Sequence, residues 1–529
     1  MPTNTWDATV STTESREHFF NTLFKKETNT HNIQMGKLQS LAKDTVIYGM
    51  SSILGRFLNY LLVPLYTAKM SVESGNYGVV TNIYAWTALL LMILTFGFET
   101  TFFRFASKEG ANVSKTFSMS MQVIGTLCVI FLFAVFAFLP SISQTLGYEA
   151  HPEFVGIMAV VVALDALQAI PFGLLRLQKR PIKFAALKLL NIFTNIALNL
   201  FVFLLLPVIC AKNPDVMGNF YTPDNQAFYV FFINLVCTAF ITLFLVPEYR
   251  LFRFTADTAL LKSMLKYSWP LLLLGVAGIL NLNADKIIYT QLVPGQQGKM
   301  ELSIYGAAVK VAAIMAMLMQ AFRYAYEPFV FGNTTTKNSK ELNAQAMKYF
   351  IIIALMAFLV VVFYMDILRH LINPDYWEGL KVVPIVMAAE IFMGIYFNLS
   401  FWYKLNDETY WGAIFSFIGC AILFAVNIIF VPRYSYMACA VGSFAGYFTA
   451  MTLSYFVGQR RNPTKYDLKG IFSYLALFAV LYAVSIILPI ENSIARMAVN
   501  TLLLIVFVGY FIKKDLPLNQ IPLIKRFVK

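Results

Sequence analysis

Residues 79–103, VVTNIYAWTALLLMILTFGFETTFF, decide the fold class, because they form a long apolar run whose single acidic residue is Glu99. A helix of this length crosses the hydrocarbon core of a bilayer, which is about 30 Å thick. Similar apolar runs follow one another along the chain with short polar gaps between them. The pattern predicts an all-α polytopic membrane protein with about fourteen transmembrane helices.

The composition excludes most other classes of protein. Of the 529 residues, 58% are hydrophobic and 13% are charged, and the mean hydropathy is +0.65. A soluble chain carries about 25% charged residues, so a cytosolic enzyme, a disordered chain and a disulfide scaffold are excluded. The net charge of +13 comes without a compact basic domain. It therefore indicates Lys-rich and Arg-rich cytoplasmic loops rather than a nucleic-acid-binding surface.

The positions of the apolar runs and of the basic loops predict the topology. The basic residues gather in alternate loops, on the side of both termini, which places the N-terminus and the C-terminus in the cytoplasm. Spans are expected near 46–68, 79–103, 116–140, 154–175, 184–207, 226–246, 268–292, 303–327, 346–369, 382–403, 409–431, 436–457, 470–489 and 493–512.

Four segments are expected from this topology. Residues 1–40 form a disordered polar cytoplasmic tail, and translation starts at Met1 or at Met35. Residues 41–250 form an N-lobe of helices 1–6, and residues 251–460 form a C-lobe of helices 7–12. Residues 461–529 hold helices 13 and 14 and a basic C-terminal tail.

Two segments repeat each other along the chain. Tyr77-Gly78 is followed by Glu99, and the same residue types recur 228 positions later as Tyr305-Gly306 and Glu327. This common offset indicates two related halves of six helices each. Because each half has an even number of helices, the repeats are parallel in the membrane, and a substrate is expected between the lobes.

Charged residues inside the spans are the candidate functional residues. Each costs roughly 2.5–3.5 kcal/mol to insert, so it usually faces a cavity. Arg56 suits bidentate capture of a phosphate, or it pairs with Asp165 or Glu99. The other candidate cations are Lys286, Lys310, Arg323, Arg104 and Arg176; the candidate ion-coupling or gating residues are Asp165, Asp285, Glu390, Glu99, Glu327 and Asn283.

Several pairings stay open at this point. Asp285 and Lys310 lie at similar depth and form an ion pair that either gates transport or only neutralises two buried charges. Arg323 and Glu327 are i,i+4 neighbours and are expected to pair on one helix. Asp165 and Glu390 are deep carboxylates that could take a proton or Na⁺. The sequence contains no P-loop and no HExxH motif, so neither ATP hydrolysis nor a metal or organic cofactor is expected.

Several short stretches resemble the polysaccharide-biosynthesis transporters of the MOP superfamily, the Wzx-type O-antigen and capsule flippases, with MurJ and MATE as relatives. The resemblance spans residues 41–460 or so. The stretches are residues 52–58 (SILGRFL), 63–67 (VPLYT), 97–104 (GFETTFFR), 267–271 (YSWPL), 283–286 (NADK), 305–310 (YGAAVK) and 427–432 (NIIFVP).

The resemblance implies a transporter and not an enzyme. It implies alternating access between two lobes and an undecaprenyl-diphosphate-linked oligosaccharide as the substrate, moved across the bacterial inner membrane for O-antigen, capsule or exopolysaccharide synthesis. The family's first-helix arginine corresponds to Arg56. Glycosyltransferases and the polymerase of the same pathway are the expected partners. The alternatives are a MurJ-like lipid II flippase, a MATE-type ion-coupled antiporter and a membrane polymerase or ligase.

Overall fold

The computed structural model describes residues 57–58, 60–212, 222–332, 339–406, 408–488 and 490–515, and every regular element in these residues is a helix. Thirteen helical segments are long and apolar enough to cross a membrane. They correspond to the second to fourteenth predicted spans, so the all-α polytopic prediction is confirmed for this part of the chain. The first predicted span, 46–68, lies largely outside the described residues, and the tail 1–40 lies wholly outside them.

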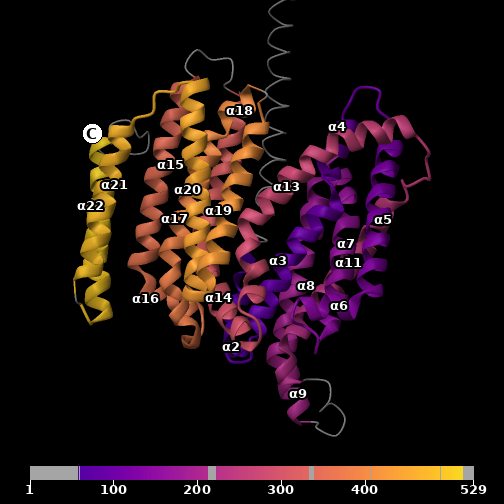
Figure 1. Ribbon diagram of the computed structural model, residues 1–529, viewed down its shortest axis with the longest axis horizontal. Helices are drawn as coiled ribbons and strands as arrows, with labels where there is room; N and C mark the ends of the chain where they lie inside the picture. The colour runs from indigo at the N-terminus through magenta and orange to yellow at the C-terminus, as the bar shows by residue number, and fades with distance from the viewer. Residues whose placement is uncertain are drawn as a thin grey trace, which may run out of the picture.

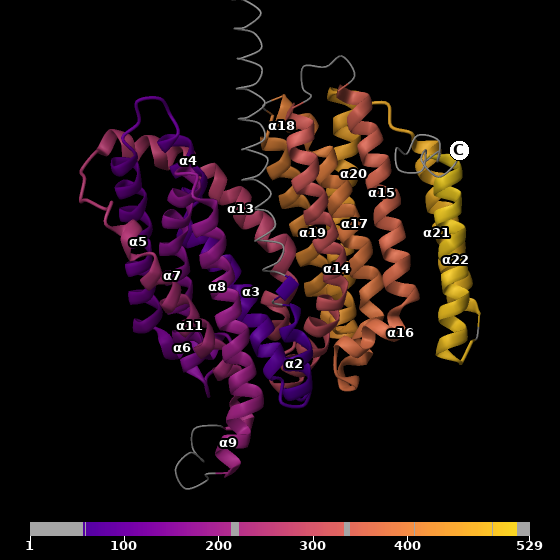
Figure 2. The same ribbon diagram turned by 180° about the vertical axis from the view of Figure 1, so that it is seen from behind.

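The helices form two bundles joined by one long helix (Figures 1 and 2). We call the first the N-terminal bundle. It contains α2 (Leu62–Lys69), α3 (Asn76–Thr95), α4 (Phe98–Ala106), α5 (Val113–Ala137), α6 (Leu139–Thr145), α7 (Pro152–Leu177), α8 (Pro181–Leu200), α9 (Leu206–Lys212), α11 (Gln226–Phe244) and α12 (Val246–Tyr249).

The second, or C-terminal, bundle is drawn in orange in Figure 1. It contains α14 (Gln296–Gly332), α15 (Ser339–Phe363), α16 (Met365–Leu368), α17 (Val383–Leu399), α18 (Phe401–Leu405), α19 (Tyr410–Tyr434) and α20 (Tyr436–Arg461). At its outer edge stand α21 (Leu468–Ile487) and α22 (Ser493–Lys514), drawn in yellow.

Helix α13 (Thr258–Leu292) crosses from one bundle to the other. Its first half packs on the N-terminal bundle, where Ser268 and Thr101 share a 2.6 Å hydrogen bond. Its second half packs on the C-terminal bundle, where Asn281 donates to the Ser416 carbonyl at 3.0 Å. The helix therefore links the two bundles along one edge of the space between them.

Two predicted spans are longer than hydropathy suggested. The predicted starts were residues 268 and 303, whereas α13 begins at Thr258 and α14 at Gln296. The extension of α14 is mostly polar and that of α13 is mixed, with Lys262 and Lys266 among apolar residues, and each is stabilised by contacts that hydropathy does not report. Asp257 caps α13 by accepting from the Leu260 N–H at 2.9 Å. Gln296, at the start of α14, donates to the Glu73 carbonyl of the other bundle at 2.7 Å.

Among the described residues, the hydrogen bonds that join α2 and α3 to the C-terminal bundle gather at the end where α2 lies, which we call the closed end (Figure 1). Tyr376 donates to the Met70 carbonyl at 2.7 Å, and the Gly78 N–H donates to the Ser303 hydroxyl at 2.6 Å. A methyl group on Gly78 would lie 2.0 Å from the Lys299 carbonyl oxygen, so α3 and α14 approach each other this closely only because residue 78 lacks a side chain.

Ion pairs fasten α21 and α22 to α15 and α16. Lys348 of α15 lies 2.5 Å from Asp515 and 2.7 Å from Asp467, which precedes α21. This ammonium group and the Gly470 N–H hold the pKa of the Asp467 carboxyl below its ordinary range. At the other end of the helices, Arg496 lies 2.7 Å from Asp366. The C-terminal helix pair is thus held at both ends.

We expect Lys348→Met to loosen this pair, because it removes the only cation that an ion pair places beside both Asp467 and Asp515 in the described residues. Lys348 is 13% exposed and Asp467 is 51% exposed, so the expected loss of stability is about 1–2 kcal/mol, below the roughly 3–5 kcal/mol of a fully buried pair. Thermal unfolding in detergent measures it, with the exposed Lys465→Met as the control. Equal melting temperatures for the two variants would contradict the prediction.

Candidate functional site

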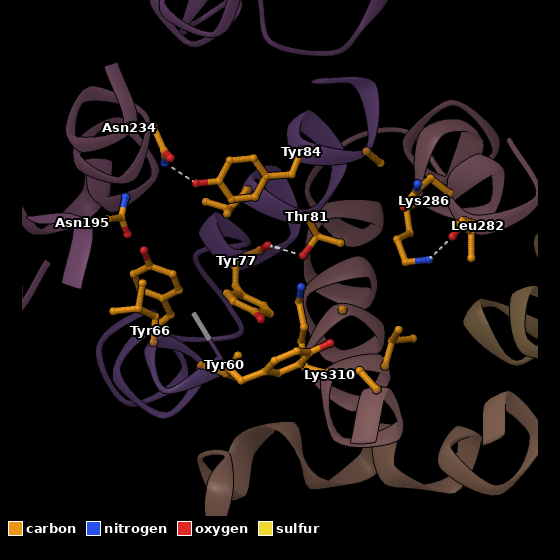
Figure 3. A pocket seen from close by; sticks show the side chains of 18 of the residues that line it. Tyr60, Tyr66, Tyr77, Thr81, Tyr84, Asn195, Asn234, Leu282, Lys286 and Lys310 are labelled. Carbon is orange, nitrogen blue, oxygen red and sulfur yellow. Dashed lines mark hydrogen bonds between the residues drawn. The ribbon is translucent and has the colours of Figure 1, made fainter. Parts of the chain in front are cut away.

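A cavity of about 650 Å³ lies between the two bundles. Its walls come from α2, α3, α7, α8 and α11 of the N-terminal bundle, from α13, and from α14 of the C-terminal bundle. The lining is rich in tyrosine, asparagine and threonine, and it includes Tyr60, Tyr66, Tyr77, Thr81, Tyr84, Asn191, Asn195, Asn234 and Thr238 (Figure 3). A mixed lining of aromatic faces and convergent polar groups is typical of a site for a polar organic ligand.

Four of the residues predicted from the sequence line this cavity: Asp165, Asn283, Lys286 and Lys310. They come from α7, α13 and α14, and so from segments far apart in the chain. Lys310 is the central cation. It extends from α14 into the cavity toward Tyr77 and Thr81 (Figure 3), and its ammonium nitrogen lies 5.5 Å from the centre of the Tyr60 ring.

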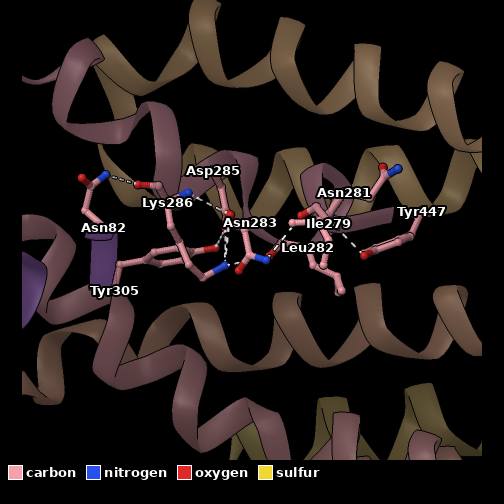
Figure 4. A network of polar contacts seen from close by, with 9 residues as sticks. All are labelled: Asn82, Ile279, Asn281, Leu282, Asn283, Asp285, Lys286, Tyr305 and Tyr447. Carbon is pink, nitrogen blue, oxygen red and sulfur yellow. Dashed lines mark hydrogen bonds and ion pairs between the residues drawn. The ribbon is translucent and has the colours of Figure 1, made fainter. Parts of the chain in front are cut away.

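Lys310 forms no ion pair with any residue that the structure describes, in contrast with Lys286. The Lys286 ammonium lies 3.0 Å from Asp285 Oδ1, so its charge is already compensated. Asp285 therefore does not pair with Lys310 in this conformation, and a pair that forms at another stage of transport stays a prediction. The Asp285 carboxylate is engaged by Lys286 and also accepts a 2.5 Å hydrogen bond from the Tyr305 hydroxyl (Figure 4).

Asp285 lies behind the cavity wall and is 2% exposed. Its network continues along α13. Asn82 of α3 donates to the Lys286 carbonyl at 2.6 Å, and Tyr447 of α20 donates to the Asn281 carbonyl at 3.2 Å (Figure 4). These contacts fix α13 between α3 and the C-terminal bundle. Asp285 thus orients the side chains of Lys286 and Tyr305. From the sequence alone, such an orienting role could not be distinguished from a role in gating.

The N-terminal bundle lines its side of the cavity with hydrogen-bonded neutral groups. Tyr66 donates to Asn199 Oδ1 at 2.8 Å, and Asn234 donates to the Tyr84 hydroxyl (Figure 3). The Asp165 carboxylate accepts from the Thr238 hydroxyl at 3.3 Å. The site therefore combines one unpaired cation, one carboxylate and several donors and acceptors that suit a ligand with many hydroxyl groups.

Three predicted residues lie at the end of the N-terminal bundle where α4 lies, away from the cavity lining. Arg176 pairs with Glu99, and the Arg104 guanidinium lies 4.0 Å from the centre of the Tyr267 ring. All three belong to the side predicted to be cytoplasmic. They could contact a ligand that enters from that end, but the structure does not bring them to Lys310.

Two further predicted residues, Arg323 and Glu390, are also not among the described residues that line the cavity. Arg323 of α14 stacks on Phe397 with its guanidinium 4.4 Å from the ring centre. Glu390 of α17 has one carboxylate oxygen, Oε2, buried without a hydrogen bond. Arg56 lies outside the described residues, and so does the side chain of Glu327. The predicted Arg323–Glu327 pair therefore stays a prediction.

The neutral residues of the cavity could not be predicted from the sequence. Tyrosine and asparagine are as common in packed helices as in binding sites, and the spacing of these residues does not single them out. They are Tyr60, Tyr66, Tyr84, Asn195 and Asn234. Within the described residues, no group of three His, Cys, Asp or Glu side chains is placed to hold a metal ion. The described cysteines are buried and free, as expected of packing residues.

Comparison with known proteins identifies the family. Residues 41–330, more than half of the chain, match a family described as "Polysaccharide biosynthesis protein". The chain belongs to this family. Comparison of the sequence with curated proteins gave no match. With thirteen candidate spans in the part of the chain that the structure describes, this polysaccharide biosynthesis protein is a multi-pass membrane protein.

Solved structures of transporters share the fold of this polysaccharide biosynthesis protein. A structure described as "Lipid II flippase MurJ, inward closed conformation" superposes with a TM-score of 0.67 at 14% identity, covering 89% of this chain and 99% of that chain. An inward-facing MATE family multidrug resistance transporter of the MOP superfamily gives 0.60 at 12% identity, covering 79% and 94%. An outward-facing one gives 0.55 at 14%, covering 79% and 95%. The two-bundle MurJ-like and MATE-like fold is thus confirmed.

Proposed function

We propose that this protein is a flippase that moves a polyprenyl-diphosphate-linked oligosaccharide across the bacterial inner membrane by alternating access. The observation that carries the proposal is Lys310, a cation without an ion-pair partner among the described residues, inside a cavity lined by tyrosine and asparagine. A lysine is a compact point charge that binds phosphate. The surrounding hydroxyl and amide groups suit sugars.

In this proposal both termini are cytoplasmic, so the closed end faces the outside of the membrane. The structure then corresponds to a state in which a lipid-linked ligand reaches the cavity from the cytoplasmic side. Arg104 and Arg176 lie on that side and would meet the anionic diphosphate first. Arg56 stays a predicted ligand of the diphosphate.

Reconstitution into liposomes tests the function. The substrate is a fluorescent undecaprenyl-diphosphate sugar in the inner leaflet of the vesicles. The signal is its exposure in the outer leaflet to a glycosidase added outside. We expect exposure that depends on the protein and is absent from empty liposomes. If no exposure occurs while an ion gradient drives uptake of organic cations, the protein is a MATE-type antiporter. Exposure of lipid II alone would make it a MurJ-like flippase.

We further propose that a proton or Na⁺ gradient drives transport through a buried carboxylate. Asp165 lines the cavity, and its described hydrogen-bond partner is Thr238, a neutral group. The charge of Lys188 also acts on Asp165, but no described ion pair holds this carboxylate, so it is open to a proton or Na⁺. We expect Asp165→Asn to make flipping insensitive to an uncoupler and to Na⁺ removal. Glu390→Gln is the comparison, because Glu390 lies away from the cavity. Wild-type ion dependence in both variants would place the coupling elsewhere.

A further inference from the structure

A second cavity, of about 570 Å³, lies inside the N-terminal bundle. It is lined by α3, α5, α6 and α7 and by Gln291 of α13, and it opens to the surface of the bundle near Phe138, which is 62% exposed. Its lining is almost wholly apolar, in contrast with the cavity between the bundles. The apolar side chains are Ile83, Trp86, Leu90, Phe131, Val135, Phe138, Ile142, Leu146, Val155, Met158, Ala159 and Val162.

Helix α3 separates this apolar cavity from the polar one. Thr81 and Tyr84 line the polar cavity, while Ile83 and Trp86 line the apolar cavity. The 3.6-residue period of a helix places these pairs on different faces of one element. A wall one helix thick therefore stands between a site that suits a charged, hydroxylated ligand and a site that suits a hydrocarbon.

Asn82 closes the contact between α3 and α13 beside this wall. Its amide donates to the Lys286 carbonyl at 2.6 Å and to the Ile287 carbonyl at 3.2 Å. It also accepts a 2.9 Å hydrogen bond from Tyr148. None of these hydrogen bonds joins two backbone groups within a helix, so they can break without unfolding α3 or α13. Separation of α3 from α13 here would open a path between the two cavities.

The apolar cavity has one unusual polar group. The indole Nε1 of Trp86 is buried and makes no hydrogen bond. Such a group costs about 1–3 kcal/mol in a tightly packed core. Thr87 donates to the Ile83 carbonyl of its own helix at 2.8 Å. The other polar groups, Ser141, Thr145 and Gln291, are exposed, and they lie on α6 and near the end of α13, toward the closed end. The cavity is thus apolar in its interior and polar toward the membrane surface.

We propose that this cavity binds the isoprenoid chain of the lipid-linked substrate as the substrate leaves the protein, an inference that rests on the proposed function. The chain is favoured over a phospholipid acyl chain because the cavity shares a wall with the head-group site. It also lies toward the closed end, where the substrate must emerge. A single molecule with a charged head and a long apolar tail fits two such sites side by side.

Quenching of Trp86 fluorescence tests the proposal. The reporter protein keeps Trp86 and carries phenylalanine at the other tryptophans, Trp6, Trp269, Trp377, Trp402 and Trp411. It is placed in phosphatidylcholine nanodiscs. The probe is polyprenyl phosphate whose double bonds carry bromine, a contact quencher of indole. We expect saturable quenching by this probe. Dibrominated phosphatidylcholine at an equal bromine content should quench weakly and without saturation.

Two substitutions on α5 supply the matched control. Val135 lines the cavity and is 8% exposed, whereas Val129 is 68% exposed and does not line it. Val135→Phe fills the cavity and is expected to raise the half-saturating probe concentration about tenfold. Val129→Phe should leave it unchanged. Ala159→Leu, on α7, repeats the filling test should Val135→Phe fail to fold.

Three results would overturn the proposal. They are equal quenching by the two brominated lipids, no quenching by the polyprenyl probe, and saturable quenching that Val135→Phe and Ala159→Leu do not change. The probe carries no sugar, and binding is measured without transport. Saturable quenching in a protein that flips no substrate would therefore refute the proposed function and leave the isoprenoid site standing. Flipping by a protein that shows no quenching would support the proposed function and refute the isoprenoid site.

Discussion

Replacing Lys310 with alanine is expected to lower the flipping rate about a hundredfold, because an unshared charge-assisted contact to phosphate in a largely dehydrated cavity contributes roughly 3 kcal/mol. The described residues offer no ion-pair partner to this lysine, so its removal strands no carboxylate. Folding should therefore be unaffected. The measurement is the initial rate of substrate exposure in liposomes, with protein level and melting temperature recorded in parallel.

The matched control is Lys262→Ala, since Lys262 is an exposed lysine near the start of α13. It should flip substrate at the wild-type rate. Lys310→Arg keeps the charge but changes its shape, and we expect partial activity. If Lys310→Ala flips substrate normally while it remains folded, Lys310 is not a substrate ligand, and the cavity between the bundles must bind its ligand through its neutral groups.

Adding one methyl group at Gly78 is expected to open the closed end. In Gly78→Ala the new carbon would lie 2.0 Å from the Lys299 carbonyl oxygen, which is backbone and cannot move aside as a side chain can. Overpacking of this kind costs about 1–3 kcal/mol, and it acts only in the conformation where α3 touches α14. The population should shift roughly ten- to a hundredfold away from that conformation.

Cysteine labelling measures the shift. Asn195→Cys, in a protein otherwise free of cysteine, places a thiol in the cavity, and a membrane-impermeant maleimide is added on the side of the closed end. Gly78→Ala should label faster than the parent. Gly125→Ala is the control, because nothing lies within 4 Å of its new methyl group. Equal labelling rates in all three proteins would show that contact at Gly78 does not keep this end shut.

The helices could be predicted from the sequence because a segment in lipid must satisfy its own backbone hydrogen bonds, as an α-helix does. An apolar run of bilayer length therefore has few alternatives to a helix. The predicted gaps between spans 409–431 and 436–457 and between spans 470–489 and 493–512 fall where α19 ends at Tyr434 and α21 at Ile487. The limits of α13 and α14 could not be predicted. The start of α13 is stabilised by its Asp257 cap and the start of α14 by a hydrogen bond to the distant Glu73, and hydropathy measures neither contact.

The site could be predicted only in part. Lys286, Lys310 and Asp165 were identified because a charged residue in an apolar run costs free energy to insert into the membrane and usually has a function there. Their partners were not found, because pairing depends on how helices rotate against one another. Asp285 meets its neighbour Lys286 and the distant Tyr305 instead of Lys310. The tyrosines and asparagines of the cavity carry no such cost, so the sequence gives no signal for them.

The crossing of α13 from the first bundle to the second has a geometric consequence for a substrate anchored in the bilayer. A tail that stays in the membrane must trail out of the protein sideways, through one of the two flanks of the space between the bundles. One flank is crossed by a continuous helix that is bonded to both halves. Lipid that approaches this flank within the membrane plane therefore meets a barrier.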